Sequence, residues 1–141
     1  MGRVFDLLIV DDDPSQLRLV EVMIHDLGLQ HRCHYASSGP KALDFLMRVY
    51  PFEHAPRPHL ILLDLNMPGM DGCELLHLLK SNPSLLSIPV IVLSTSYAQQ
   101  DVDSCYREHA NAYVKKPADY EGTFNLLRDI DRFWAGTAVV A

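Results

Sequence analysis

Short runs of apolar residues alternate along the chain with longer stretches in which apolar side chains recur every three or four positions. Four of the runs, at residues 7–10, 60–63, 90–93 and 112–114, are rich in β-branched or large aliphatic side chains and show no alternation with polar residues. Such runs are typical of parallel strands that are buried on both faces. Residues 29–36 alternate apolar and polar side chains instead, which predicts an edge strand with one wetter face.

The longer stretches predict amphipathic helices that pack on this sheet. Pro14 suits a first helical turn, and Gly28 suits a helix stop. Strands and helices alternate through five β-α units, and right-handed crossovers then predict an α/β fold, a doubly wound five-stranded parallel sheet. Strand order 2-1-3-4-5 would place strands 1 and 3 side by side, with helices on both faces. The apolar stripes contain Leu17, Val20, Ile24 and Leu27; Leu43, Leu46 or Met47, and Tyr50; and Tyr120, Phe124, Leu127, Ile130 and Trp134.

Acidic residues follow two of the predicted strands. Residues 11–13 are all Asp and come directly after the first run, while Asp64 ends the third. In this strand order both positions reach the switch point at the carboxyl edge of the sheet, where ligands bind. Converging carboxylates repel one another and need a cation, and oxygen ligands of this kind favour Mg²⁺. Ser94 and Lys116 end the fourth and fifth runs and are suited to bind phosphoryl oxygens, so the edge predicts a magnesium and phosphoryl site.

Charge and composition narrow the function classes. The net charge is -6 and Lys and Arg do not cluster, which argues against nucleic acid as a direct partner. No apolar run approaches the ~18 residues of a membrane span, and the start of the chain leaves no room for a signal peptide, so we expect a cytoplasmic protein. Cys33, Cys73 and Cys105 are widely spaced, which indicates buried thiols rather than a disulfide framework or a zinc site. The seven histidines show no metal-ligand spacing.

Five features together resemble the receiver domain of two-component response regulators, a CheY-like domain with a flavodoxin-like fold, over about residues 4–134. They are an acid pair after the first strand, Asp64 followed by x-x-M-P-G-M-D-G, Ser94 after the fourth strand, Tyr113 in the fifth, and a Lys-Pro pair after it. The segment 51–59 and the phrase L-I-L-L-D-L-N-M-P are similar to the stand-alone regulators that pair with bacterial and cyanobacterial phytochromes.

The resemblance implies that Asp64 accepts a phosphoryl group from a sensor histidine kinase, such as a bacteriophytochrome, in a Mg²⁺-dependent reaction in which Mn²⁺ can substitute. Asp12 would be the main carboxylate on the metal, together with Asp64. Asp11 would act through water, and the backbone carbonyl of Asn66 would be a third ligand. The protein would be a stoichiometric phosphoacceptor that assists its own phosphorylation and dephosphorylation, not an enzyme.

The same resemblance assigns the switch residues. Ser94, with Thr95 as the alternative hydroxyl, would hydrogen-bond the phosphoryl group, and Lys116 would pair with it. Tyr113 would follow Ser94 and change the face made by the fourth helix, the fifth strand and the fifth helix, although ordinary packing explains Tyr113 equally well. In this family the Lys-Pro peptide is typically cis, so we expect a cis bond between Lys116 and Pro117.

Residues 1–134 are expected to form the receiver domain and residues 135–141 a short apolar tail, with no output domain. Output would then be binding to another protein or release from the kinase. Leu126, Phe133 and Trp134 give the last helix more apolar surface than one face needs. This favours a homodimer through the face just described, and the alternative is a wide buried face under the tail.

Three alternatives stay open. Asp13 is either a helix cap or an extra acid that tunes metal binding. The protein is either a phosphoacceptor or a pseudo-receiver that binds partners without phosphorylation, which the intact acids, Ser94 and Lys116 disfavour. The third is a phosphohydrolase with an aspartyl nucleophile, which would want a second Asp where Asn66 stands.

Overall fold

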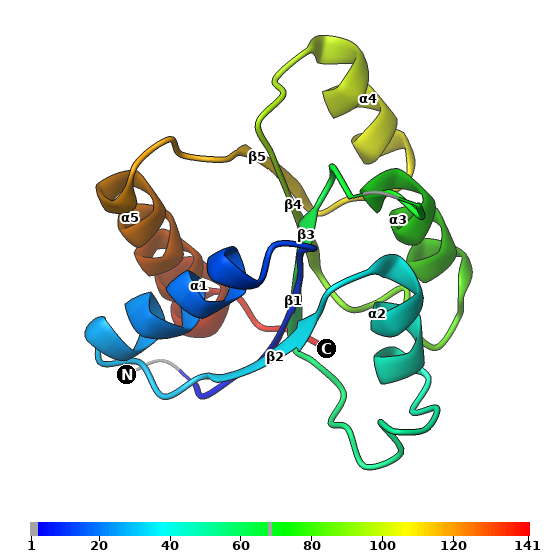
Figure 1. The fold of residues 1–141 in the computed structure, drawn as a ribbon, viewed down its shortest axis with the longest axis horizontal. Helices are drawn as coiled ribbons and strands as arrows, with labels where there is room; N and C mark the ends of the chain where they lie inside the picture. Colours follow the sequence, from blue (N-terminus) through cyan, green and yellow to red (C-terminus); the bar gives the residue numbers. More distant parts are fainter. Residues whose placement is uncertain (1–2, 68) are drawn as a thin grey trace.

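The computed structural model describes residues 3–67 and 69–141 and shows a parallel sheet between two layers of helices (Figure 1). The five strands lie in the order β2-β1-β3-β4-β5, which confirms the predicted α/β doubly wound sheet. The elements are β1 (Asp6–Val10), α1 (Pro14–Asp26), β2 (Arg32–Ala36), α2 (Gly39–Leu46), β3 (Leu60–Asp64), α3 (Gly72–Ser81), β4 (Val90–Ser94), α4 (Gln99–Arg107), β5 (Ala112–Lys115), α5 (Tyr120–Ile130) and the π-helix η1 (Asp131–Thr137).

Both faces of the sheet are covered, which is why the central strands carry no polar alternation. Helices α1 and α5 lie on one face, and α2, α3 and α4 lie on the other (Figure 1). Because side chains alternate along a strand, Leu8 and Val10 of β1 belong to one hydrophobic cluster while Leu7 and Ile9 belong to the other. Every residue of β1 and β3 is buried. The edge strand β2 is more exposed, as predicted, since only Ala36 at its end is fully buried, and the other outer strand, β5, is likewise only partly buried.

The last helix does not end at Trp134. It continues from α5 into η1, which runs to Thr137 and buries Ala135. The carbonyl of Ala135 accepts a hydrogen bond of 3.1 Å from the backbone N–H of Arg3, so this turn packs beside the start of the chain. Trp134 packs against the same hydrophobic cluster as Phe5.

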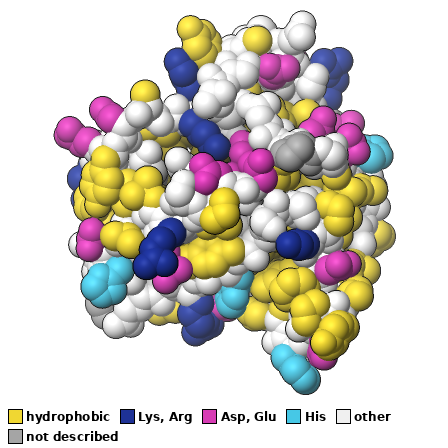
Figure 2. Space-filling view, viewed as in Figure 1, with side chains coloured by type: hydrophobic (Ala, Val, Ile, Leu, Met, Phe, Trp, Pro, Cys, Tyr) yellow, Lys and Arg dark blue, Asp and Glu magenta, His cyan; other side chains and the backbone are white. Residues whose placement is uncertain are grey.

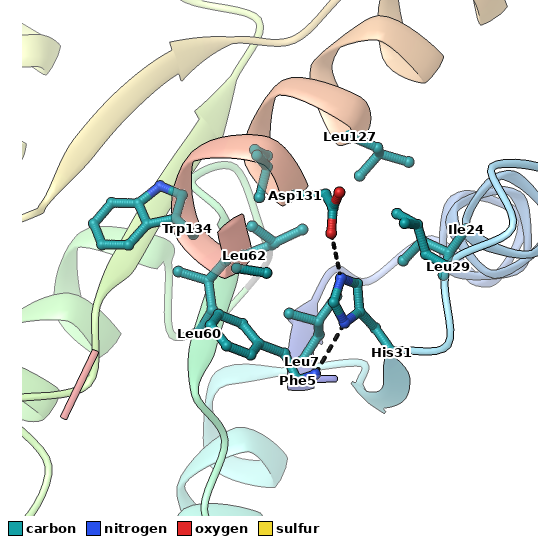
Figure 3. Close-up of a pocket in the computed structure, with 12 residues that line it drawn as sticks. Phe5, Leu7, Ile24, Leu29, His31, Leu60, Leu62, Leu127, Asp131 and Trp134 are labelled. Carbon is teal, nitrogen blue, oxygen red and sulfur yellow. Dashed lines mark hydrogen bonds and ion pairs between the residues drawn. The ribbon is translucent and has the colours of Figure 1, made fainter. Parts of the chain in front are cut away.

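A partly buried polar pair lies at the amino end of the sheet (Figure 3). His31 Nδ1 accepts the backbone N–H of Phe5 at 2.9 Å, and its Nε2 lies 2.7 Å from an Asp131 carboxylate oxygen. The cavity beside them is about 20 Å³ and almost wholly apolar. This is about the size of one water molecule, so it does not serve as a substrate site. Within the described residues, no helix has the length and apolar character needed to cross a membrane.

Candidate functional site

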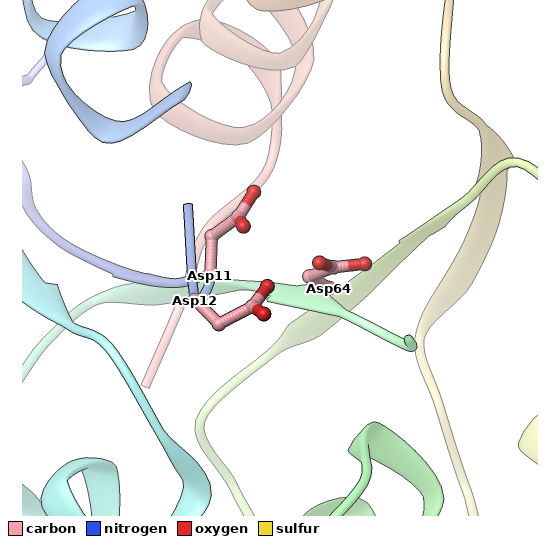
Figure 4. Close-up of side chains that lie close together, drawn as sticks. All are labelled: Asp11, Asp12 and Asp64. Atoms are coloured by element: carbon pink, nitrogen blue, oxygen red, sulfur yellow. The ribbon is translucent and has the colours of Figure 1, made fainter. Parts of the chain in front are cut away.

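The register of β1 and β3 brings the predicted acids together. Val10 lies opposite Leu63 in this parallel pair, so Asp11 and Asp64, one residue further along, reach the carboxyl edge at the same level. Asp11, Asp12 and Asp64 each offer a carboxylate oxygen, and these oxygens lie within 4.8 Å of one another (Figure 4). In the space-filling view, acidic side chains gather beside basic ones near the centre of the face (Figure 2).

The side chain of Lys116 faces this cluster. Lys116 Nζ lies 3.3 Å from Asp64 Oδ1 and 3.5 Å from Asp11 Oδ2. The backbone N–H of Lys116 donates to the carbonyl of Ser94 at 2.7 Å, which fixes where the lysine leaves the sheet. Burial raises the pKa of Asp64, and the nearby ammonium of Lys116 only partly offsets this effect. Three carboxylates therefore face one ammonium, and the site carries an excess of negative charge.

Asp64 lines the open cavity at the end of β3, and the N–H of Gly72 donates to the carbonyl of Leu65 at 3.0 Å, which brings the start of α3 back to the strand. The N–H of Asn66 donates to Asp64 Oδ1 at 3.2 Å, which orients the carboxylate. Gly69 has φ 75°, a backbone conformation that favours glycine. At Gly72 a Cβ atom would lie 2.6 Å from Leu65 Cα and 2.7 Å from the Asp64 carbonyl oxygen, so only glycine lets α3 start this close to the strand. Asp71 caps α3 by accepting from the N–H of Glu74 at 2.9 Å.

Ser94 and Thr95 occupy different environments. Ser94 is completely buried, and its Oγ accepts from the N–H of Ser96 at 3.1 Å and from the side-chain amide of Asn66 at 3.4 Å. Thr95 is exposed and lines the open cavity that holds the acids, whereas Ser94 is absent from that lining. Both hydroxyls therefore remain candidates, with Ser94 connected to the site through Asn66.

Tyr113 is linked to the loop after β4 rather than to Ser94 directly. Its hydroxyl donates to the carbonyl of Ser96 at 2.8 Å, and Ser96 Oγ in turn donates to Asp101 of α4 at 2.6 Å. The ring packs against the hydrophobic cluster on the α3 side of the sheet. A chain of hydrogen bonds thus runs from Ser94 through Ser96 to both Tyr113 and α4.

Asp13 is the cap of α1. Its Oδ1 accepts from the backbone N–H of Ser15 at 3.0 Å and from the Ser15 hydroxyl at 2.7 Å, and these hydrogen bonds lower its pKa. Its own N–H donates to Asp11 Oδ1 at 3.0 Å. The helix-cap alternative is therefore confirmed.

The expected cis peptide at Lys116-Pro117 is wrong. Among residues 3–67 and 69–141 the cis peptide bond is between Tyr50 and Pro51, and the bond between Lys116 and Pro117 is trans. The trans form is the intrinsically preferred isomer of X-Pro bonds. Lys116 Nζ reaches Asp64 and Asp11 with the trans bond in place, so no local contact demands the less favourable isomer.

The residues predicted for a dimer face lie in three settings. Leu126 lines the same open cavity as the acids. Phe133 is 52% exposed and stands edge-on to Trp134, with ring centroids 5.3 Å apart. Trp134 is turned toward the core and lines the small apolar cavity at the amino end of the sheet. Of the three, Phe133 offers the most surface to a second copy, and the dimer stays a prediction.

Sequence reasoning missed the other walls of the site and a second cluster. The cavity at the acids, about 360 Å³, is also lined by Gln16 and Thr123. They follow the acids or Lys116 by a few residues, so their proximity was the available signal. At the opposite edge Asp6 is buried beneath Arg32 and His34, with contacts of 2.8 and 3.0 Å to Oδ1. The pairing of Asp6 with Arg32 across β1 and β2 becomes visible only once the strand register is known.

The donor set at the carboxyl edge fits a divalent metal ion. Asp11, Asp12 and Asp64 supply only oxygen atoms, which suit hard cations, and the site has more negative charge than Lys116 neutralises. A cation placed among the three carboxylates would relieve their mutual repulsion.

Comparisons with known proteins agree with this geometry. Residues 7–128 match the family model described as response regulator receiver domain. The response regulator Rcp1 of Synechocystis is 37% identical over 134 residues, which cover 95% of this chain and 91% of Rcp1.

Crystal structures give the same result. The phosphorylated cyanobacterial phytochrome response regulator RcpA superposes with a TM-score of 0.91 at 35% identity, over 98% of this chain and 99% of that chain. The Mn²⁺-bound form of Rcp1 superposes with a TM-score of 0.88 at 36% identity, over 97% of this chain and 99% of that chain. The chain therefore belongs to the response regulator receiver domain family and is related to phytochrome response regulators.

Proposed function

We propose that this protein accepts a phosphoryl group on Asp64 from the phosphohistidine of a sensor histidine kinase, in a reaction that requires Mg²⁺, with Mn²⁺ as a substitute. One observation carries the proposal: Asp64 combines burial with two flanking carboxylates within 4.8 Å and the Lys116 ammonium at 3.3 Å. Phosphoryl transfer depends mostly on positioning and on neutralising charge, and this arrangement provides a nucleophile with both.

The roles of the residues follow from their positions. Asp64 attacks phosphorus through a carboxylate oxygen, and the phosphorus–nitrogen bond to the kinase histidine breaks. Lys116 is placed to pair with the phosphoryl oxygens, and Asn66 holds the carboxylate through its N–H. Asp12 and Asp64, the Asn66 carbonyl, and Asp11 through water would hold the metal. When bound, Mg²⁺ neutralises the charge that develops on the phosphoryl oxygens.

Phosphorylation would be read out through Ser94 and its neighbours. A phosphoryl group on Asp64 offers Ser94 or Thr95 a new acceptor, and Ser94 Oγ currently accepts from Ser96. Ser96 is bonded to both Tyr113 and Asp101, so a change at Ser94 reaches β5 and α4 together. The surface of α4, β5 and α5 is the proposed switch face, with dimer contacts through Phe133 and, less directly, Leu126 and Trp134.

The kinase is proposed to be a bacteriophytochrome, which the similarity to RcpA supports. The downstream partner would be another protein. In this scheme the protein is a stoichiometric phosphoacceptor and not an enzyme. Its own residues assist both the transfer of the phosphoryl group to Asp64 and its later hydrolysis.

The direct test is incubation with acetyl phosphate and Mg²⁺, followed by intact mass and treatment with base. We expect one base-labile phosphoryl group in the wild type and none in Asp64→Asn. Asp13→Asn is the matched control, because it changes a neighbouring acid while Asn retains the capping function. A folded wild type that takes up no phosphate would leave the pseudo-receiver as the better description, and incorporation in Asp64→Asn would place the acceptor elsewhere.

The dimer is tested separately by sedimentation with and without a phosphoryl mimic such as beryllofluoride. Phe133→Ser should weaken a dimer that strengthens with the mimic. A concentration-independent monomer in both states would remove the dimer from the proposal.

A further inference from the structure

Two cysteines join the helix that follows the phosphoacceptor to the helix of the proposed switch face. Cys73 is the second residue of α3, and Cys105 lies in the second half of α4. Their Sγ atoms are 4.0 Å apart, in direct contact. A second contact lies nearby, where Nδ1 of His77 in α3 and Oε2 of Glu108, the residue that follows α4, are 2.7 Å apart. The contact between α3 and α4 therefore contains one thiol pair and one polar pair.

The two thiols differ in access. Cys105 is fully buried, whereas Cys73 is half-buried and lines an open cleft between α3 and α4 that also includes His77, Arg107 and Glu108. A small oxidant can therefore reach Cys73 from solvent. Cys105 can react only with a group that is already beside it, and the sulfur of Cys73 is such a group.

Cys73 lies next to a residue that packs directly against the end of β3, where Asp64 is located. The residue before it, Gly72, lies so close to the Asp64 carbonyl that no side chain fits between them. The start of α3 is thus fixed against the end of β3. A covalent bond from Cys73 to Cys105 would fix α4 to the same point.

We propose that Cys73 and Cys105 form a disulfide under oxidising conditions, and that this bond holds α4 against α3. The regulatory consequence rests on the proposed function, because it matters only if α4 responds to phosphorylation. The disulfide itself is independent of Asp64 chemistry.

The oxidant is a peroxide, and the reaction balances in two steps. The Cys73 thiolate attacks one peroxide oxygen, the O–O bond breaks, and the departing hydroxide takes up a proton, which leaves a sulfenic acid and water. The Cys105 thiolate then attacks the Cys73 sulfur, the S–S bond forms, the S–O bond breaks, and a second water leaves. Two thiols are oxidised and one peroxide is reduced.

Burial makes both thiols slow to react at neutral pH. It raises the pKa of Cys73, with the nearby acids Asp71, Asp101 and Glu108 acting in the same direction. Burial also raises the pKa of Cys105 to about 12. Since the thiolate is the nucleophile, the pair stays reduced under mild conditions and responds only to sustained oxidation.

The experiment treats the full chain with hydrogen peroxide at mildly alkaline pH, and maps peptides without reduction. We expect the loss of two hydrogen atoms from the intact mass and a Cys73–Cys105 cross-linked peptide. Cys33→Ser should retain the cross-link. Cys105→Ala, which keeps the buried site apolar, should lose it and leave Cys73 as a sulfenic acid that can be trapped. Independent oxidation of each thiol, or cross-links between copies through Cys33, would overturn the proposal.

A second readout tests the hold on α4. Amide hydrogen exchange over α4 should slow roughly tenfold in the oxidised protein and recover on reduction. The cross-link should form equally well in Asp64→Asn, so failure of phosphorylation and failure of the disulfide are told apart. Unchanged exchange in a protein shown to be cross-linked would contradict the restraint on α4.

Discussion

Buried aspartates lie at both ends of the strands, at the amino edge and at the carboxyl edge of the sheet. The surroundings shift their pKa values in opposite directions. At the amino edge Asp6 accepts from Arg32 Nε and Nη2 at 2.8 and 2.9 Å and contacts His34 at 3.0 Å. These hydrogen bonds, from Arg32 above all, lower the pKa of Asp6 to about 2. At the carboxyl edge, burial raises the pKa of Asp64. The two environments are only one strand length apart, because β1 begins with Asp6 and is followed directly by Asp11, the neighbour of Asp64.

The difference separates an acid whose charge is stabilised within the fold from the acid that we propose accepts the phosphoryl group. Asp6 has enough donors to stabilise its negative charge within the protein, so it needs no ligand. Asp64 shares one ammonium with Asp11 and lies near Asp12, so a bound cation would relieve the repulsion among these three carboxylates. Perturbed pKa values of this kind in an open cavity are expected at functional sites.

The largest expected change in stability comes from removing the charge of Asp6 at the amino edge. Asp6→Asn removes the charge that Arg32 and His34 hold, and should lower the free energy of unfolding by about 3 kcal/mol. Arg32 is 64% exposed and can regain water, which keeps the loss at the low end of the range for buried pairs. Urea unfolding measures the loss. If Asp6→Asn unfolds with the same free energy as the wild type, Asp6 does not stabilise the pairing of β1 with β2.

Acid should reproduce most of that loss in the wild type. The folded pKa of Asp6, about 2, is below its ordinary value of 3.8. Its stabilising effect is therefore fully present above pH 3.8 and disappears as the pH falls through about 2. We expect a loss of roughly 2 kcal/mol over that interval. The stability difference between wild type and Asp6→Asn should shrink over the same interval, and a constant difference would refute the linkage.

Magnesium should act at the carboxyl edge alone. At ten times its dissociation constant, Mg²⁺ should stabilise the wild type by about 1.4 kcal/mol, because it binds only the folded site. Asp12→Asn should need at least about tenfold more Mg²⁺ for the same rise in melting temperature. Asp6→Asn is the matched control and should keep the full response to Mg²⁺. Equal responses in all three proteins would mean that the cation binds elsewhere.

The smallest effect has the opposite sign to the first. Asp64→Asn removes a carboxylate whose raised pKa marks its charge as unfavourable in the fold. Without metal it should increase the free energy of unfolding by about 1 kcal/mol. As the pH falls through the raised pKa of Asp64, this advantage over the wild type should vanish, because the wild-type carboxyl becomes neutral too. A less stable variant at neutral pH would show that the ion pair with Lys116 dominates over burial.

Local sequence patterns were sufficient to predict the strands and helices and the acidic residues of the site. The run before Asp64 forms β3, Asp13 caps α1, and Lys116 faces the acids as its place after the fifth run suggested. Each inference needed only a strand period, a cap residue or the rule that parallel strands end at one edge.

Features that depend on contacts between distant segments could not be predicted from these local patterns. The burial of Ser94 and the inward turn of Trp134 depend on what packs around them. The contact between Cys73 and Cys105 depends on how α3 lies beside α4. Nothing in the spacing of these residues along the chain encodes that geometry.

The sequence by itself determined the order of strands and helices, the edge at which Asp64 meets Asp11 and Asp12, and the charge excess that calls for a cation. These follow from periodicity and residue chemistry, which are local. Only the tertiary structure decided that Asp6 is neutralised while Asp64 is not, and that α3 touches α4 through two thiols. Such outcomes depend on register and packing, because a carboxylate's free energy is set by the donors and solvent around it and not by its neighbours in the chain.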